Sequence, residues 1–170
     1  MSKLLRFRIT TTILCLVLLS FSFCKKATNT TDFFQDPIAQ LSGGEFRMES
    51  FQGKVLVLDF WATWCEPCSK AVPTLNQWKE QVDPSVFHFY GVNTDTSESL
   101  DAIRLHTKKL KMRYPSLLDP DWKLTEHYKI DGIPCVLVFG KDGRIVYRQY
   151  GLDQSDLTGL LLRSKVWAMD

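Results

Sequence analysis

Histidine and metal-binding motifs are scarce in this chain of 170 residues. The three histidines, His88, His106 and His127, stand far apart, and the few methionines form no copper-binding pattern. Cys65 and Cys68 form one close-set pair, but a structural zinc ion usually takes a second such pair of cysteine or histidine, and none is present. The sequence therefore argues against a structural zinc site and indicates no other cofactor.

An excess of charge of one sign is also missing from most of the chain. Lys3, Arg6 and Arg8 are the only charged residues among the first 24, and the rest contains 18 basic and 19 acidic residues. The formal net charge of +2 therefore comes from the amino terminus. Because no basic face is expected, nucleic acid is not an expected partner. The 45% hydrophobic and 24% charged residues are ordinary for a soluble globular domain.

A long apolar run occurs once, directly after the basic amino terminus. It spans residues 9–23, which is shorter than the roughly 20 residues that a membrane-spanning helix usually needs. This layout is typical of a secretory signal peptide. Cys24 at its end resembles a bacterial lipoprotein cysteine, although Phe21 and Phe23 depart from the usual lipobox. Lipidation, ordinary cleavage and an uncleaved anchor all stay open, and each places the domain outside the cytoplasmic membrane.

Three parts are expected along the chain: a signal peptide or anchor over 1–24, a polar tether over 25–37 and one domain over 38–170. The domain contains no internal repeat. Turn residues and hydrophobic periodicity predict its elements. They are an N-terminal hairpin within 38–54, strands over 55–60, 86–92, 135–140 and 144–150, helices over 66–81, 97–112 and 121–128, and a final helix after Asp153.

The order of these elements predicts an α/β fold with a mixed central sheet flanked by helices. Residues 55–60 and 86–92 are continuous apolar runs, typical of strands that are buried on both faces. The sequence KDG (141–143) indicates a tight turn between the last two strands. The sequence CEPC (65–68) then falls where the first long strand ends and its helix begins.

Cys65 and Cys68 have the spacing of a working dithiol. In the first turn of a helix their Cα atoms would lie about 5–6 Å apart, within the range of a disulfide. Such a bridge closes a loop too short to constrain the unfolded chain, so it would be a poor structural staple. The helix start favours a thiolate at Cys65, and Pro67 suits the first helical turn. We predict that Cys65 is the nucleophile and that Cys68 resolves the mixed disulfide.

Asp59 interrupts an apolar strand six residues before Cys65. Burial of an unpaired carboxylate is costly, so we expect the pKa of Asp59 to be raised. Its predicted role is that of proton acceptor for Cys68, which must lose its proton before it attacks the mixed disulfide. The alternative is an aspartate that caps a local turn at the strand end.

The segments VLVLDFWATWCEPC (55–68) and YKIDGIPCVLVFGKDGRIVYRQYG (128–151) resemble the thioredoxin superfamily. FWATWCEPC, the YPSLLD segment and the separation between CxxC and GIP are similar to the TlpA/ResA branch of envelope thiol–disulfide oxidoreductases. The resemblance covers nearly all of residues 38–168. It implies a thioredoxin fold with an added N-terminal β-hairpin and a central insertion at roughly 94–120.

The resemblance also implies roles for residues around the dithiol. The peptide bond between Ile133 and Pro134 would be cis, a minority conformer that tertiary structure must select. Pro134 would pack against the dithiol, and Ile133 would offer its backbone to a bound substrate. Trp64 would cover the approach to the active site, and Gly151 would border the substrate groove.

Three residues depart from the pattern of this branch. Asp59 stands where TlpA-like proteins often have asparagine, and Ala71 stands where ResA-type proteins carry a buried glutamate. The buried carboxyl near the dithiol is therefore expected at Asp59 and not at position 71, which weakens the expectation of a ResA-like substrate preference. Cys135 follows Pro134 at a position that is usually threonine. It is either a small buried residue or a third sulfur that regulates the dithiol.

Glu66 and Pro67, between the two cysteines, are expected to tune the redox potential. A carboxylate beside Cys65 opposes thiolate formation and so counters the helix dipole, each effect being on the order of 1 kcal/mol near a surface. We therefore expect a mildly lowered pKa for Cys65 and a reducing, thioredoxin-like potential.

These features predict a monomeric protein-disulfide reductase of the cell envelope, tethered to the membrane by its amino terminus. The expected partners are disulfide-containing exported proteins, such as apocytochrome c or copper-site assembly proteins, and a membrane thiol electron donor. A copper-binding chaperone that uses the CxxC pair and a thiol peroxidase are the alternatives. The peroxidase is disfavoured because Ala62 lies three residues before Cys65, where that chemistry usually wants threonine.

Overall fold

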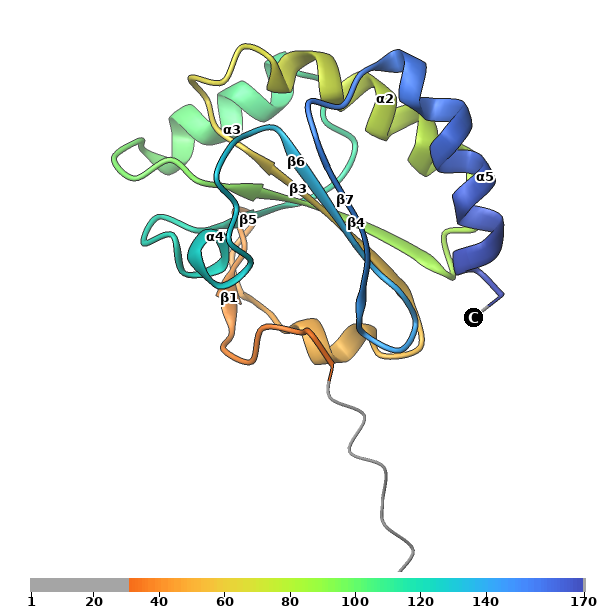
Figure 1. The fold of residues 1–170 in the computed structure, drawn as a ribbon. Coiled ribbons are helices and arrows are strands. Elements are labelled where there is room, and N and C mark those ends of the chain that lie inside the picture. The colour runs from red at the N-terminus through yellow and green to blue at the C-terminus, as the bar shows by residue number, and fades with distance from the viewer. Residues whose placement is uncertain (1–30, 170) are drawn as a thin grey trace, which may run out of the picture. The chain divides into compact units, whose positions relative to one another are not determined.

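A five-stranded mixed sheet forms the centre of the structure, a computed structural model that describes residues 31–169 (Figure 1). Its strand order is β5-β4-β3-β6-β7, with β3, β4 and β5 parallel and β6 antiparallel to both of its neighbours. The strands are β3 (Val55–Trp61), β4 (Phe87–Asn93), β5 (Ser116–Leu118), β6 (Cys135–Phe139) and β7 (Ile145–Tyr150). The predicted mixed central sheet is confirmed. The predictions for residues 1–24, including Cys24, lie outside the described residues.

Helices cover both faces of this sheet (Figure 1). The α-helices α2 (Cys68–Gln81) and α5 (Leu157–Trp167) lie on one face. On the other lie α4 (Lys123–His127), the 3₁₀ helix η1 (Met48–Phe51) and the N-terminal hairpin of β1 (Ile38–Ala39) and β2 (Glu45–Phe46). In the described part of the chain, no helix is long and apolar enough to cross a membrane. The remaining elements are the α-helix α3 (Leu100–Lys109) and the 3₁₀ helix η2 (Gln154–Asp156).

The side chains of β3 alternate between two cores. Leu56 and Leu58 pack on the face that α4 and the hairpin cover. Val55 and Val57 pack on the face that α2 and α5 cover. Because successive side chains of a strand point to opposite faces, Asp59 points to the same side as Val55 and Val57. The strand therefore directs its one ionisable side chain toward α2.

β5 is a strand that the sequence analysis did not predict. Its three residues follow Pro115 directly and Pro120 comes soon after, so the run is too short for an alternation to be recognised. It pairs in parallel with β4, with Leu117 opposite Val92. The predicted insertion at 94–120 thus supplies both α3 and an edge strand of the sheet.

α3 is shorter than the helix predicted over 97–112. Ser99 is its N-cap, and the Ser99 hydroxyl accepts a hydrogen bond from the amide of Ala102. A serine cap satisfies an amide at the helix start that has no partner within the helix. Beyond the last turn, Lys111 has a positive φ of 54°, which is incompatible with a continuing right-handed helix.

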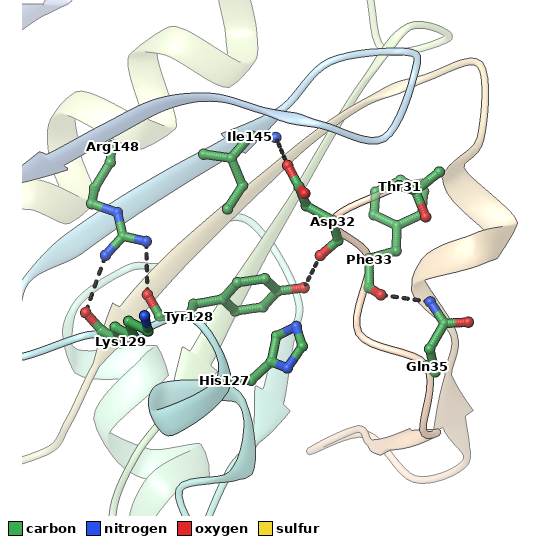
Figure 2. Close-up of a pocket in the computed structure, with 9 residues that line it drawn as sticks. All are labelled: Thr31, Asp32, Phe33, Gln35, His127, Tyr128, Lys129, Ile145 and Arg148. Carbon is green, nitrogen blue, oxygen red and sulfur yellow. Dashed lines mark hydrogen bonds between the residues drawn. The ribbon is translucent and has the colours of Figure 1, made fainter. Parts of the chain in front are cut away.

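Residues 31–37 pack against the domain, although the sequence analysis placed them in the tether. Phe33 is buried in the core. The Asp32 carboxylate accepts a hydrogen bond from the amide of Ile145 (Figure 2). The backbone carbonyl oxygen of Asp32 accepts a second one from the Tyr128 hydroxyl. The packed domain therefore begins earlier in the chain than the predicted boundary.

Candidate active site

Cys65 and Cys68 lie at the amino-terminal end of α2 and form a disulfide. Cys68 is the first residue of the helix, Pro67 is its N-cap, and Cys65 and the exposed Glu66 lie in the turn before it. The two Cα atoms are 5.4 Å apart, within the predicted range. The amide of Cys68 donates to Cys65 Sγ at 3.2 Å. When the bridge is reduced, this donor and the helix dipole favour a thiolate at Cys65.

Asp95 holds the loop that leads into the dithiol. Its carboxylate accepts hydrogen bonds from the amide and the hydroxyl of Thr63, at 2.9 and 3.0 Å, and from the Asn93 side chain at 2.7 Å. Thr94 supports the same loop, because its amide donates to the carbonyl oxygen of Trp61. The sequence analysis missed Asp95, for which the polar run directly after a buried strand was the available signal.

Pro134 directly precedes β6. The peptide bond between Ile133 and Pro134 is cis, as the resemblance implied. Ile133 packs against the cluster that contains Cys65 and Cys68. The amide of Gly151 donates to the carbonyl oxygen of Pro134 at 3.0 Å, and Gly151 has a φ of 67°, which favours glycine. The structure therefore links Gly151 to the cis-proline, and the residue before that proline packs against the cluster of the dithiol.

A cavity of about 600 Å³ adjoins the cis peptide and has a mostly apolar lining. Trp64 lines it and is 69% exposed, and Ile133 belongs to its wall. Trp122, which the sequence analysis missed, lines it too, with its indole N–H donating to the Thr94 carbonyl oxygen at 3.0 Å. Its only signal in the sequence was an aromatic residue within a polar segment that follows a proline. The cavity has the size and lining to hold an apolar side chain of a bound polypeptide.

Asp59 lies on the α2 side of the sheet and is only 2% exposed. Its Oδ2 atom accepts a hydrogen bond from the Tyr114 hydroxyl at 2.8 Å, and its Oδ1 atom has no partner among the described residues. Burial raises the pKa of Asp59 to about 7, as predicted, and the hydrogen bond from Tyr114 opposes this increase. Tyr114 was not among the predicted site residues. A carboxyl with this pKa can take up or release a proton near neutral pH.

Comparison with known proteins shows the family of this chain. Residues 25–148 match the AhpC/TSA family. The chain belongs to the AhpC/TSA family. It is 25% identical over 114 residues to a thiol-disulfide oxidoreductase ResA of Bacillus cereus, a match that covers 67% of this chain and 65% of that ResA. Identity to ResA of Bacillus subtilis is 30% over 106 residues, which cover 62% of this chain and 58% of the relative.

The chain therefore spans less than two thirds of the length of these ResA relatives. Its fold is similar to that of the thioredoxin domain of a thiol-disulfide oxidoreductase from Bacteroides vulgatus, with a TM-score of 0.67 and 26% identity. That match covers 81% of this chain and 96% of the Bacteroides domain. The predicted thioredoxin fold of this AhpC/TSA family member and its resemblance to ResA-like oxidoreductases are confirmed.

Asp59→Asn is expected to stabilise the oxidised protein at high pH. The pKa of this carboxyl is about 7 in the folded chain and about 3.9 in an unfolded chain. Between these values the folded state binds more protons than the unfolded state, so the free energy of unfolding falls as the pH rises. Asparagine removes this dependence. The variant should therefore gain about 2–4 kcal/mol over the wild type at pH 8 and little at pH 4.

Denaturant unfolding of both proteins at the two pH values measures this difference. The exposed Asp121 provides a matched control, because Asp121→Asn removes the same charge without changing a buried group. An Asp59→Asn gain that is equal at pH 4 and pH 8 would contradict the raised pKa.

Cys135 is a buried free thiol at the start of β6. Burial raises the pKa of Cys135 to about 12, although the nearby Arg148 partly opposes this. A thiol with this pKa stays protonated at neutral pH and is a weak nucleophile. This favours the interpretation of Cys135 as a small buried residue over that of a third reactive sulfur.

The histidines of this AhpC/TSA family member lie apart, as their spacing in the sequence indicated. His88 lies on β4, His106 on α3 and His127 on α4, and each packs against an aromatic ring. Within residues 31–169, no group of three or more histidine, cysteine or acidic side chains is placed to hold a metal ion.

Proposed function

We propose that the protein is a thiol–disulfide oxidoreductase of the cell envelope that reduces disulfides in exported proteins. The Cys65–Cys68 pair at the start of α2 carries this proposal, together with a buried carboxyl on the sheet face that α2 covers. The similarity to ResA and to the thioredoxin domain from Bacteroides vulgatus supports it.

The exchange begins at Cys65. Its thiolate attacks one sulfur of the substrate disulfide, forms a mixed disulfide and releases the other substrate sulfur as a thiolate, which takes a proton from water. The Cys68 amide and the dipole of α2 stabilise the attacking thiolate. Cys65 is 5% exposed and Cys68 only 1%, so an incoming disulfide meets Cys65 first.

Cys68 completes the exchange. Asp59 accepts the Cys68 proton, and the Cys68 thiolate attacks Cys65 Sγ. The bond from Cys65 to the substrate breaks, the second substrate thiolate leaves, and the Cys65–Cys68 disulfide forms. Two electrons have then passed from the dithiol to the substrate. A membrane thiol donor returns two electrons through a second exchange of the same kind.

The substrate lies along the groove beside the cis-proline in this proposal. The backbone at Ile133 and Gly151 borders its extended chain, and Trp64 covers the approach to Cys65. The cavity between Trp64 and Trp122 takes an apolar side chain close to the substrate disulfide. A groove with these properties selects polypeptides rather than small disulfides.

The amino terminus and the dithiol together suggest where the protein works and which partners it meets. The basic and apolar amino terminus exports the domain, and a lipid on Cys24 or an uncleaved anchor holds it at the periplasmic side of the membrane. Apocytochrome c haem-site cysteines and copper-site assembly proteins are the substrates that fit a reductase at this location. The domain acts as a monomer.

The reduction potential of the dithiol tests the direction of electron flow. Equilibration with a dithiothreitol or glutathione buffer, followed by alkylation of free thiols, should give a midpoint below about −200 mV. Glu66→Gln should raise the midpoint by about 20 mV, because removal of the charge beside Cys65 stabilises the reduced form by on the order of 1 kcal/mol. A wild-type midpoint near −120 mV, roughly that of a strong disulfide oxidant, would overturn the reductase proposal.

A further inference from the structure

We propose that Tyr114 is a positioning residue that sets the proton affinity of Asp59 and thereby the pH at which Cys68 becomes a nucleophile. The inference rests on the dithiol exchange proposed above. It assigns a role to the segment between α3 and β5, which lies within the insertion at 94–120.

Tyr114 reaches Asp59 from a distant part of the chain. Its hydroxyl donates to Asp59 Oδ2 at 2.8 Å, across 55 positions of sequence, and both side chains are buried. The Tyr114 ring packs in the core between the sheet and α2, with Ala71 and Leu75 of that helix in the same cluster. Ala71 lies one turn after Cys68, so the core that holds Tyr114 reaches the first turns of the helix that carries the dithiol.

Few other groups face Asp59 from the neighbouring strands. Its partners in the sheet are Gly91 on β4 and Val136 on β6, neither of which titrates. The titratable groups that interact with Asp59 are Tyr114 and the thiol of Cys135 on β6, whose pKa the Asp59 charge raises. In the proposed exchange, Cys68 at the start of α2 is the third once it is reduced. Within residues 31–169, no cationic side chain forms an ion pair with Asp59.

Tyr114 is therefore the protein's one hydrogen-bond donor to the Asp59 side chain in the described part of the chain. A hydrogen bond to a carboxylate is stronger than one to a neutral carboxyl, so the Tyr114 hydroxyl favours the ionised form of Asp59. The ionised form is the one that can accept the Cys68 proton. Oδ1, buried and without a protein partner, is the oxygen left free to take that proton.

Tyr114→Phe tests this role by the pH dependence of a single step. When the reduced protein reacts with the chromogenic disulfide 5,5′-dithiobis(2-nitrobenzoate), Cys65 releases one thionitrobenzoate and Cys68 then releases the second from the mixed disulfide. Stopped-flow absorbance separates the two phases. We expect the pH midpoint of the second phase to rise by about one to two pH units, because a hydrogen bond to a charged group is lost, and that of the first phase to stay unchanged.

Tyr128→Phe is the matched control. Tyr128 is also a buried tyrosine with a hydrogen-bonded hydroxyl, but it packs on the opposite face of the sheet, in the core under α4. Tyr128→Phe should lower the free energy of unfolding without moving the pH midpoint of either phase. In an Asp59→Asn background, Tyr114→Phe should cause no further shift, because the group that it acts through is gone.

A second substitution at position 114 keeps the test independent of folding. Tyr114→3-fluorotyrosine retains the ring and the hydroxyl and makes the hydroxyl a stronger donor, so the midpoint of the second phase should fall. If Tyr114→Phe and Tyr114→3-fluorotyrosine leave that midpoint unchanged while wild type shows both phases, Tyr114 is only structural and the inference is overturned. If wild type lacks the second phase, the dithiol exchange itself fails, and this inference fails with it.

Discussion

Cys65→Ser is expected to lower the rate of disulfide reduction by about a thousandfold or more, because loss of a nucleophile removes the covalent route. Serine is nearly as large as cysteine, but its hydroxyl does not ionise near neutral pH and does not attack disulfides. Cys68→Ser should behave differently. It retains the first attack by Cys65 and lacks the resolving sulfur, so mixed disulfides through Cys65 should accumulate in cells and be visible on non-reducing gels.

Cys135→Ser provides the matched control for both cysteine variants. The thiol of Cys135 is buried and protonated at neutral pH, so its loss should leave the reduction rate and the pattern of adducts unchanged. Mass spectrometry of the adducts of Cys68→Ser would identify the physiological substrates. Absence of adducts that depend on Cys65 would count against the reductase proposal.

Trp78→Ala is expected to produce the largest loss of stability, about 3–5 kcal/mol in the free energy of unfolding. Trp78 is fully buried in α2, and its indole N–H donates to the hydroxyl of Ser164 in α5 at 2.7 Å. Its ring packs edge-on against Phe89 of β4, with centroids 5.0 Å apart. Alanine would leave a cavity where α2, α5 and the sheet meet, and the Ser164 hydroxyl would lose one of its partners.

Leu105→Ala on α3 is the matched comparison for this prediction. Leu105 is also a large apolar residue of a helix, but it is 69% exposed, so its truncation should change the free energy of unfolding by less than about 0.5 kcal/mol. Urea unfolding followed by circular dichroism measures both variants. A loss for Trp78→Ala as small as that for Leu105→Ala would mean that Trp78 does not link α2 to α5.

The local chemistry of the dithiol was readable in the sequence. The continuous apolar run over 55–60 predicted a buried strand, and CEPC at its end placed Cys65 and Cys68 at the start of a helix, where the structure has them. Asp59 stood out because it is a carboxyl in an apolar run, and burial alone was enough to predict its raised pKa. Each of these inferences depends on residues that are close together in the sequence.

The main strands and helices of the fold could also be predicted from local patterns in the sequence. Long runs with a clear period predicted β3, β4, α2 and the hairpin of β6 and β7, because a strand or helix of this length shows its pattern within one segment. β5 escaped prediction since it has only three residues and forms by pairing with β4. The packing of residues 31–37 escaped too, because a short segment with two phenylalanines among polar residues has no helix or strand period and does not reveal which surface it will contact.

Residues that are close together in the chain were thus enough to predict the dithiol, the buried carboxyl, the order of strands and helices and the kinship with thioredoxin-like proteins. Which distant residues meet at the site depends instead on the tertiary structure. It brought Tyr114 to Asp59, Asp95 to Thr63 and Trp122 to the cavity beside Trp64. These partners lie tens of residues apart, and their contacts follow from how the segment after β4 folds back onto the carboxyl end of the sheet. No periodicity within a single segment records such a contact, because the free energy that selects it arises from the packing of the whole domain.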